Sequence, residues 1–343
     1  MPETNQADLI PQQAGKLLSH VAGLVAHRTI EMGLRHGLIA AVAGHQDGVS
    51  PAALAEETKL DPFYAEVWCR AAVGAEVLDA IEGDAYQLAP AMDQLLLNPD
   101  FPGWVGGIFQ LMVQPELFDH FAAKLPSGDG PWWDTVSADF IEGVSLTSRP
   151  FYTRLLAGGI SRVPGLDERL SSGAHVAELA CGTSRGLVRL AAAYPQSTWV
   201  AVDGDAHSLD VSRAVLDEGG VLDQVTLEQS TLEEWDHRAE FDAVLINVSM
   251  HECRDIDRVT DNVLQALKPG GLFVISDFPF PDSAAGLRTT PARVMSGIQY
   301  FEALIGDQLL PTAAFVDLLN RHGFRDVEGL EIAPVHNIVH GTK

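Results

Sequence analysis

From His175 onward, short β-rich runs alternate with helical segments, and this alternation constrains the fold more than any other feature of the chain. The runs expected to form strands are His175–Leu179, Thr198–Val202, Gln224–Leu227, Ala243–Asn247, Leu272–Ser276, Phe324–Ile332 and Val335–His340. Helical stretches between them are Gly186–Ala193, His207–Glu218 and Arg258–Leu267. Alternation at this spacing is typical of an α/β fold with a doubly wound parallel sheet, and the last two runs favour a terminal hairpin.

The first hundred residues show a different pattern, mostly helical with one hairpin. The stretch Gln13–Ala43 is rich in helix formers, with apolar residues on more than one side, which favours either a dimer arm or a buried core helix. Ser50 before Pro51 is a helix start. Two helices, Ala52–Lys59 and Phe63–Leu78, and a hairpin over Ala80–Leu88 are predicted next. Helix, turn, helix and hairpin form a winged-helix outline.

Charge disfavours the DNA-binding role that a winged helix suggests. Residues 1–100 hold 5 Lys/Arg and 14 Asp/Glu, and the whole chain of 343 residues has a formal charge of −25. Phosphate contacts drive DNA affinity, so we expect no nucleic-acid partner. A homodimer formed through the N-terminal domain is the better prediction. A DNA-binding regulator that senses a cofactor remains the lesser alternative.

Other compositional features place the chain among globular proteins. No run of about 18 apolar residues occurs, so no membrane span is expected. The N-terminus lacks a basic and apolar leader, which predicts a cytoplasmic protein. The three cysteines show no CxxC spacing, so neither a disulfide framework nor a cysteine zinc site is supported. We expect three regions: residues 1–100, an aromatic-rich helical connector over 101–168 that contributes to a substrate pocket, and a catalytic domain over 169–343.

The strongest chemical signal is the turn that follows the first predicted strand of the C-terminal half. Its sequence is Glu178-Leu-Ala180-Cys-Gly182-Thr-Ser184-Arg-Gly. The small residues in this turn would let the protein backbone approach a ligand closely. Asp203 ends the next strand, 21 residues after Gly182. A carboxylate at that distance can accept both hydroxyls of a nucleoside ribose. The alternative role for Asp203 is to cap the following helix.

These residues resemble the Asp/Glu-x-Gly-x-Gly-x-Gly motif of class I S-adenosylmethionine-dependent methyltransferases. A second stretch is similar to the fourth strand and following loop of the small-molecule O-methyltransferases: Phe241-Asp-Ala-Val-Leu-Ile-Asn247-Val-Ser-Met-His251-Glu252. Leu267-Lys-Pro-Gly-Gly-Leu-Phe-Val-Ile-Ser-Asp277 resembles their Pro-Gly-Gly turn and fifth strand. The resemblance covers roughly residues 165–343, and the winged-helix outline matches the dimerisation domain of that family more loosely. It implies a Rossmann-like seven-stranded methyltransferase sheet.

By position, the resemblance implies a site for S-adenosylmethionine and a catalytic pair. Residues expected to contact the cofactor are Glu178, Ala180, Gly182, Asp203, Gly204, Ser230, Thr231 and Asn247. His251 falls at the position of the catalytic histidine, and Asp277 at that of its acidic partner. A histidine with a pKa near 6.5 can take the proton of an acceptor hydroxyl, and a carboxylate behind it fixes the tautomer.

The chain departs from the family pattern at four places. Ala180 and Ser184 replace the first and third glycines, and Gln229-Ser230-Thr231 stands where an acidic residue often binds the adenine amino group. Counting back from Phe315 places Leu309 at the second acidic position, so we expect His251 to have one acidic partner rather than two.

The sequence therefore predicts a methyltransferase that acts on a hydroxyl of a small aromatic or polyketide-like metabolite. Methylation of carbon or nitrogen, or a rearrangement without methyl transfer, is the alternative that the altered motif leaves open. We expect no metal: His251 and Glu252 with His322, His336 or His340 offer metal-binding atoms, but only His336 and His340 have an i, i+4 spacing, and they lie in a predicted strand.

Overall fold

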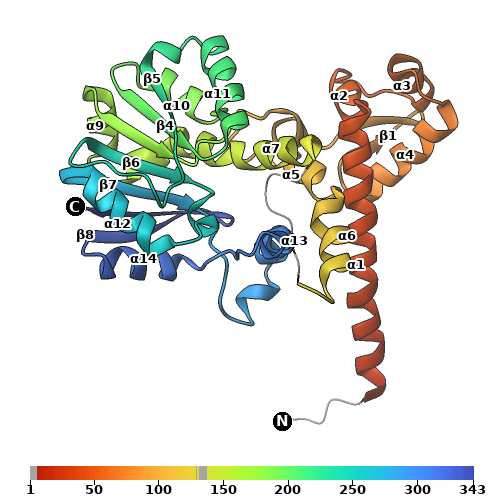
Figure 1. Cartoon of the computed structure of the whole chain (residues 1–343). Coiled ribbons are helices and arrows are strands. Elements are labelled where there is room, and N and C mark those ends of the chain that lie inside the picture. The colour runs from red at the N-terminus through yellow and green to blue at the C-terminus, as the bar shows by residue number, and fades with distance from the viewer. Residues whose placement is uncertain (1–5, 129, 131–136) are drawn as a thin grey trace. The chain divides into compact units, whose positions relative to one another are not determined.

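The computed structural model describes residues 6–128, 130 and 137–343 (Figure 1). The chain divides into two compact units, residues 1–111 and residues 112–343. The described helices of the predicted connector from Met112 onward thus belong with the second unit. In the described residues, no helix combines the length and the apolar character that crossing a bilayer requires.

The first unit is helical apart from one small hairpin, as the sequence predicts. Its elements are α1 (Gln6–Arg35), α2 (Leu38–Ala43), α3 (Pro51–Thr58), α4 (Pro62–Gly74), β1 (Leu78–Ile81), β2 (Ala85–Leu88), the short π-helix η1 (Asp93–Leu97) and α5 (Gly106–Leu111). β1 and β2 pair antiparallel. Ser50 accepts a hydrogen bond from the backbone N–H of Ala53 and so caps α3.

Two predicted helix boundaries in this unit were wrong. The predicted helix Gln13–Ala43 is two helices, because Gly37 adopts a left-handed conformation (φ 70°) that ends the regular hydrogen bonding between α1 and α2. α1 also begins earlier, at Gln6. The helix predicted to reach Leu78 ends at Gly74, and Leu78 instead begins β1. Glu76, with φ 60°, lies at this turn.

Apolar side chains line an exposed stretch of α1. They are 57–67% exposed and comprise Ile10, Leu17, Leu18, Val21, Leu24 and Val25. The start of α4 adds Phe63 and Tyr64, which are 68% and 71% exposed. A row of exposed apolar side chains along one helix is more typical of an interaction site than of a free surface.

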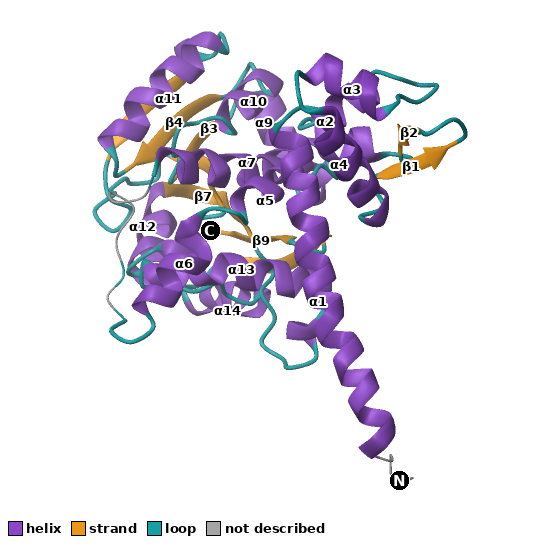
Figure 2. Ribbon diagram, turned by 90° about the vertical axis from the view of Figure 1, so that its right-hand side faces the viewer, coloured by secondary structure: helices purple, strands orange, loops and turns teal. Residues whose placement is uncertain are grey.

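The second unit is an α/β domain (Figure 2). Before the sheet come α6 (Pro115–Lys124), α7 (Ala138–Arg154), the π-helix η3 (Leu155–Gly159), α8 (Ile160–Arg162) and α9 (Leu166–Ser172). The alternating part contains β3 (His175–Leu179), α10 (Leu187–Ala193), β4 (Thr198–Asp203), α11 (Ala206–Glu218), η4 (Leu222–Gln224), β5 (Val225–Gln229), β6 (Phe241–Asn247), η5 (Met250–Glu252), α12 (Ile256–Ala266) and β7 (Leu267–Asp277). The chain ends with η6 (Gly286–Arg288), α13 (Thr290–Leu304), α14 (Thr312–Arg321), β8 (Arg325–Ala333) and β9 (His336–Thr342).

Within the described residues, seven strands form one sheet in the order β5-β4-β3-β6-β7-β9-β8. β3 to β7 pair parallel, whereas β9 pairs antiparallel with both β7 and β8. The sheet is therefore mixed, and the seven predicted strands and the terminal hairpin are confirmed. Because β3, β4, β6 and β7 run in the same direction, their carboxyl ends lie along one edge of the sheet.

Apolar residues cover both faces of this sheet. On one face, strand residues such as Val176 and Ala201 pack with α9, α10 and α11. On the other, Ala177 and Val244 pack with α12 and α14. Adjacent strand residues thus enter opposite cores, as the pleat requires. This packing fixes the strands and leaves their polar end residues free to form a site.

Candidate active site

The turn after β3 has an unusual backbone. Ala180, Gly182 and Ser184 all adopt positive φ values, at 51°, 51° and 55°. Such φ values suit glycine and strain other residues, so the two substitutions in the motif keep the turn conformation at a conformational cost. A Cβ atom built on Gly182 would meet nothing within 4 Å. The turn therefore has open space beside its central glycine.

Glu178 lies fully buried at the end of β3 and is held by two side chains. Its Oε1 accepts hydrogen bonds from the Tyr152 hydroxyl (2.8 Å) and from Asn247 Nδ2 (3.2 Å). Burial raises the pKa of Glu178 to about 7, although these two hydrogen bonds favour the charged form. Among the described residues, Glu178 Oε2 and Asn247 Oδ1 are buried without a donor. Two buried acceptors side by side are suited to a ligand that donates hydrogen bonds, such as an ammonium group.

Asp203, at the end of β4, is bonded to backbone amides. Its Oδ2 accepts from the N–H of Gly182 (2.8 Å), and its Oδ1 accepts from the N–H of Asp205 (2.9 Å). Burial raises its pKa, and these amides partly offset that effect. The cap of α11 is Asp205, which accepts from the amides of His207 and Ser208. The capping alternative for Asp203 was therefore wrong.

Gly204 lies beside the end of β5. A Cβ atom on Gly204 would be 3.8 Å from the carbonyl oxygen of Ser230 and 4.0 Å from Thr231 Cα. The N–H of Ser230 also donates to the carbonyl of Asp203 (3.1 Å). The structure thus brings Asp203, Gly204, Ser230 and Thr231 together at the carboxyl ends of β4 and β5.

His251 and Asp277 form a buried pair at the carboxyl ends of β6 and β7. Nδ1 of His251, in η5, is 2.8 Å from Asp277 Oδ1 and 3.0 Å from Oδ2. The N–H of Phe278 donates to the same Oδ1 (2.7 Å) and fixes the carboxylate. Asp277 therefore holds the Nδ1–H tautomer and turns Nε2 toward the opposite side.

Glu302 of α13 lies on that opposite side. Its Oε2 is 3.7 Å from His251 Nε2, and the two side chains are 5% and 1% exposed. The prediction of one acidic partner was therefore wrong. The count back from Phe315 pointed to Leu309 because it assumed a fixed length for the segment between α13 and α14. Leu309 is instead an apolar residue buried in the core.

Sequence analysis missed Glu302, although one signal was available. The buried positions of α13 also include Met295, Ile298, Phe301 and Leu304, so Glu302 is a carboxylate on an apolar face. A buried carboxylate is costly unless it has a partner or a function. Such a residue was a candidate for a site at the sheet edge.

Electrostatics around His251 are dominated by carboxylates. Burial alone would lower the pKa of His251, but Asp277 and then Glu302 outweigh it and hold that pKa well above 6.5. Burial, reinforced by the charge of Glu302, holds the pKa of the neighbouring Glu252 well above its usual value. Burial also raises the pKa of Asp307 to about 6, again with Glu302 contributing. The carboxylates thus make the His251 imidazole more basic than a free imidazole, and burial makes Glu252 and Asp307 weaker acids than free carboxyl groups.

Aromatic rings stand beside this cluster. The centroid of Phe278 is 6.2 Å from that of His251, and Phe151 of α7 makes an edge contact with Phe278 at 5.0 Å. Farther along α7 and α13, Phe140 packs on Phe301 at 4.3 Å. The second unit thus gives the histidine an apolar surrounding.

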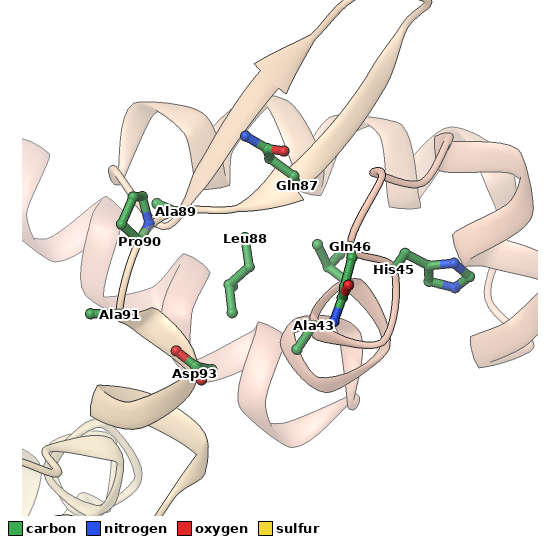
Figure 3. A pocket seen from close by; sticks show the side chains of 10 residues that line it. Ala43, His45, Gln46, Gln87, Leu88, Ala89, Pro90, Ala91 and Asp93 are labelled. Carbon is green, nitrogen blue, oxygen red and sulfur yellow. The ribbon is translucent and has the colours of Figure 1, made fainter.

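Each of the two units has a surface pocket. One, of about 310 Å³, lies in the first unit between the end of α2 and the turn after β2 (Figure 3). Its only lining imidazole, His45, bonds to Glu57 (2.8 Å). The other, of about 300 Å³, is lined by Tyr152 and by Arg185 and Gly186 of the glycine-poor turn. The second pocket, unlike the first, adjoins the predicted site residues.

Residues 176–271 match the family model described as "Methyltransferase domain". A curated relative, trans-aconitate 2-methyltransferase of Azoarcus sp. (strain BH72), is 29% identical over 174 residues. That alignment covers 50% of this chain and 63% of the relative, so the match spans less than two thirds of the length of that enzyme.

Solved structures resemble nearly the whole chain. Human N-acetylserotonin methyltransferase in complex with S-adenosylmethionine gives a TM-score of 0.70 at 14% identity, covering 100% of this chain and 99% of that one. Mitomycin 7-O-methyltransferase gives 0.72 at 16%, covering 98% and 100%. A putative O-methyltransferase from Nostoc punctiforme gives 0.72 at 15%, covering 99% and 100%. Residues 176–271 are thus similar to a methyltransferase domain, and the fold of the whole chain is similar to that of these solved methyltransferases.

Proposed function

We propose that this protein transfers the methyl group of S-adenosylmethionine to a hydroxyl of a small aromatic or polyketide-like metabolite, with His251 as general base. The observation that carries the proposal is the buried Asp277–His251 pair. It lies at the same sheet edge as the motif turn, in a chain with the methyltransferase fold. The enzymes named O-methyltransferases among the similar structures support transfer to oxygen.

The cofactor end of the site is built from β3, β4, β5 and β6. Glu178 Oε2 and Asn247 Oδ1 would accept from the methionine ammonium, which would supply the donors that these buried atoms lack among the described residues. Gly182 and Ala180 would let the backbone approach the cofactor, and Asp203 would accept the ribose hydroxyls with lone pairs not used by its two amides. Gly204, Ser230 and Thr231 line the adenine end. The bound cofactor supplies an electrophilic methyl group on a sulfonium.

The acceptor end is built from η5, β7 and α13. Asp277 keeps the proton on Nδ1, so the Nε2 lone pair would be available to take the proton of an acceptor hydroxyl. Asp277 then stabilises the imidazolium. Glu302, 3.7 Å from Nε2, adds negative charge on the same side. Phe151 and Phe278 favour an aromatic acceptor, because aromatic rings pack well on one another.

The proposed partner is a second copy of the chain, bound through the first unit. The exposed apolar side chains of α1, from Ile10 to Val25, form the kind of surface that a symmetric dimer buries. Their spacing along one helix suits an isologous contact, in which the same face packs on itself. Sedimentation equilibrium of the wild type and of Leu18→Glu would test it.

Calorimetry and a substrate screen test the proposed reaction. We expect S-adenosylmethionine and S-adenosylhomocysteine to bind with a stoichiometry of one per chain, and a screen with labelled donor to give a product heavier by one methyl substitution. His251→Ala should lower kcat by about 10²-fold or more, the usual scale for a lost general base, with an unchanged cofactor Kd. Equal turnover in that variant would remove the base role, and a product without a mass change would remove methyl transfer.

A further inference from the structure

We propose that His251, Glu252 and Glu302 form a binding site for a divalent transition-metal ion, Zn²⁺ in particular, and that the bound ion inhibits the enzyme. Binding of the ion follows from these three side chains alone. Its inhibitory effect rests on the proposed function, because it requires His251 to be the general base.

The three side chains lie close enough to share one ion. One donor atom from each lies within 4.8 Å of the others, and His251 Nε2 is 3.7 Å from Glu302 Oε2. Zinc binds histidine nitrogen and carboxylate oxygen at about 2.0–2.2 Å, so two ligands of one ion can be up to about 4.2 Å apart. The His251–Glu302 pair already meets this limit. The donor atom of Glu252 lies within 4.8 Å of both other donor atoms, so all three side chains can contribute to one site.

A second observation points to a ligand at this place. His251 Nε2 and Glu302 Oε2 face each other, and neither has a hydrogen-bond partner among the described residues. Both side chains are more than nine-tenths buried. Buried polar atoms without partners are rare in folded proteins and call for an explanation, such as an ion.

The other nitrogen of His251 has the environment of a metal ligand. Nδ1 bonds to Asp277, which in turn accepts the N–H of Phe278. Histidines that bind metals almost always donate the second ring N–H to a carboxylate or carbonyl, which fixes the ring and strengthens the ligand. Asp277 therefore prepares Nε2 for coordination without being a ligand itself.

Charge and ligand type select the class of ion. Two glutamates bring two negative charges, which one divalent cation balances. One imidazole nitrogen with two carboxylate oxygens suits Zn²⁺ or Co²⁺, whereas Mg²⁺ prefers oxygen ligands and retains its waters. Sequence analysis expected no metal because it looked for the third ligand among His322, His336 and His340. The structure instead brings Glu302 from α13 to His251.

Coordination and catalysis compete for the same lone pair. When Nε2 binds the ion, it cannot accept the proton of the acceptor hydroxyl. The enzyme should therefore be active with a chelator present and lose activity as Zn²⁺ fills the site.

The test uses the full chain freed of metal by a chelator and then dialysed. Calorimetry with ZnCl₂ should show saturable binding of one ion per chain, and CoCl₂ should give the visible absorption of four- or five-coordinate Co²⁺. Glu252→Gln should weaken binding at least 10-fold, and should relieve inhibition of methyl transfer by Zn²⁺ when the activity of each protein is expressed relative to its own activity in chelator. Glu234→Gln, at an exposed acid, is the matched control and should behave as the wild type.

Several results would overturn the proposal. Absence of saturable Zn²⁺ binding, or equal binding by wild type, Glu252→Gln and Glu302→Gln, would mean that surface acids alone hold the ion. Loss of methyl transfer in chelator would overturn the inhibitory role. A chain that binds one Zn²⁺ through Glu252 but transfers no methyl group would retain the metal site and remove only the proposed function. The Co²⁺ spectrum of the wild type decides the question even where a variant fails to fold.

Discussion

Asp203 at one end of the site and Glu302 at the other are held in opposite ways. At the cofactor end, both oxygens of Asp203 accept backbone N–H groups, and Glu178 has two side-chain donors on one oxygen. At the acceptor end, Glu302 Oε2 lies 3.7 Å from His251 Nε2, with no hydrogen bond in the described residues. Both ends lie at the carboxyl edge of the same sheet.

This difference follows from the elements that supply the residues. Asp203 is tied to the turn that it faces, so the strand and turn that position it also satisfy its charge. Glu302 comes from α13, which approaches the edge from outside the alternating part of the fold. Side chains that are already held in place can bind a ligand of fixed shape. Side chains with unsatisfied polar atoms can instead exchange protons with a reacting ligand. We infer that the first end serves binding and the second serves proton transfer.

The sharpest way to break this comparison is Asp277→Asn. The change removes the charge that fixes the His251 tautomer, so kcat should fall by about 10²-fold or more, while cofactor Kd should stay within about twofold. The measurement is kcat at saturating donor together with calorimetry of S-adenosylhomocysteine. A loss of cofactor affinity equal to the loss in kcat would show that the two ends are not separate.

The same variant has a signature in pH. In the wild type, carboxylates hold the pKa of His251 well above 6.5, so kcat/KM should rise with pH through a value above 6.5 as the base loses its proton. Asp277→Asn should move this limb to lower pH. The raised pKa also stabilises the fold, fully below pH 6.5, and this contribution disappears as pH rises through the folded-state pKa. Asp277→Asn should therefore cost the most stability at low pH.

A smaller effect is expected at the cofactor end from Asp203→Asn. The Asn side-chain amide keeps one hydrogen-bond acceptor but lacks the negative charge of Asp203. A hydrogen bond to a charged group contributes about 1.5–3 kcal/mol. The Kd for S-adenosylmethionine should rise about 10-fold or more. kcat at saturating donor should remain close to that of the wild type. Asp205→Asn, at the cap of α11, is the matched control and should leave Kd nearly unchanged.

The sequence predicted the candidate site residues that lie at the ends of strands far better than those that helices bring to the same edge of the sheet. Glu178, Asp203, Asn247 and Asp277 end strands whose order and direction follow from local patterns, so their convergence could be foreseen. Glu302 could not be placed, because its position depends on how α13 packs and on the length of the segment after it. Tyr152 was recognised only as one aromatic residue among many, since its bond to Glu178 joins elements 26 residues apart.

The smallest expected effect concerns the turn after β3, at the proposed cofactor end. Ala180 has φ 51°, a conformation that costs an L-residue about 1–2 kcal/mol and glycine almost nothing. Ala180→Gly removes this strain but makes the unfolded chain more flexible, which opposes it by about 0.4–1 kcal/mol. We therefore expect the free energy of unfolding to rise by up to about 1 kcal/mol, measured by urea denaturation. Ala177→Gly, in the preceding strand β3 and without a positive φ, should lower it. If both variants lost stability equally, the turn would be relaxed despite its backbone angles, and the preorganisation assigned to the cofactor end would need another source.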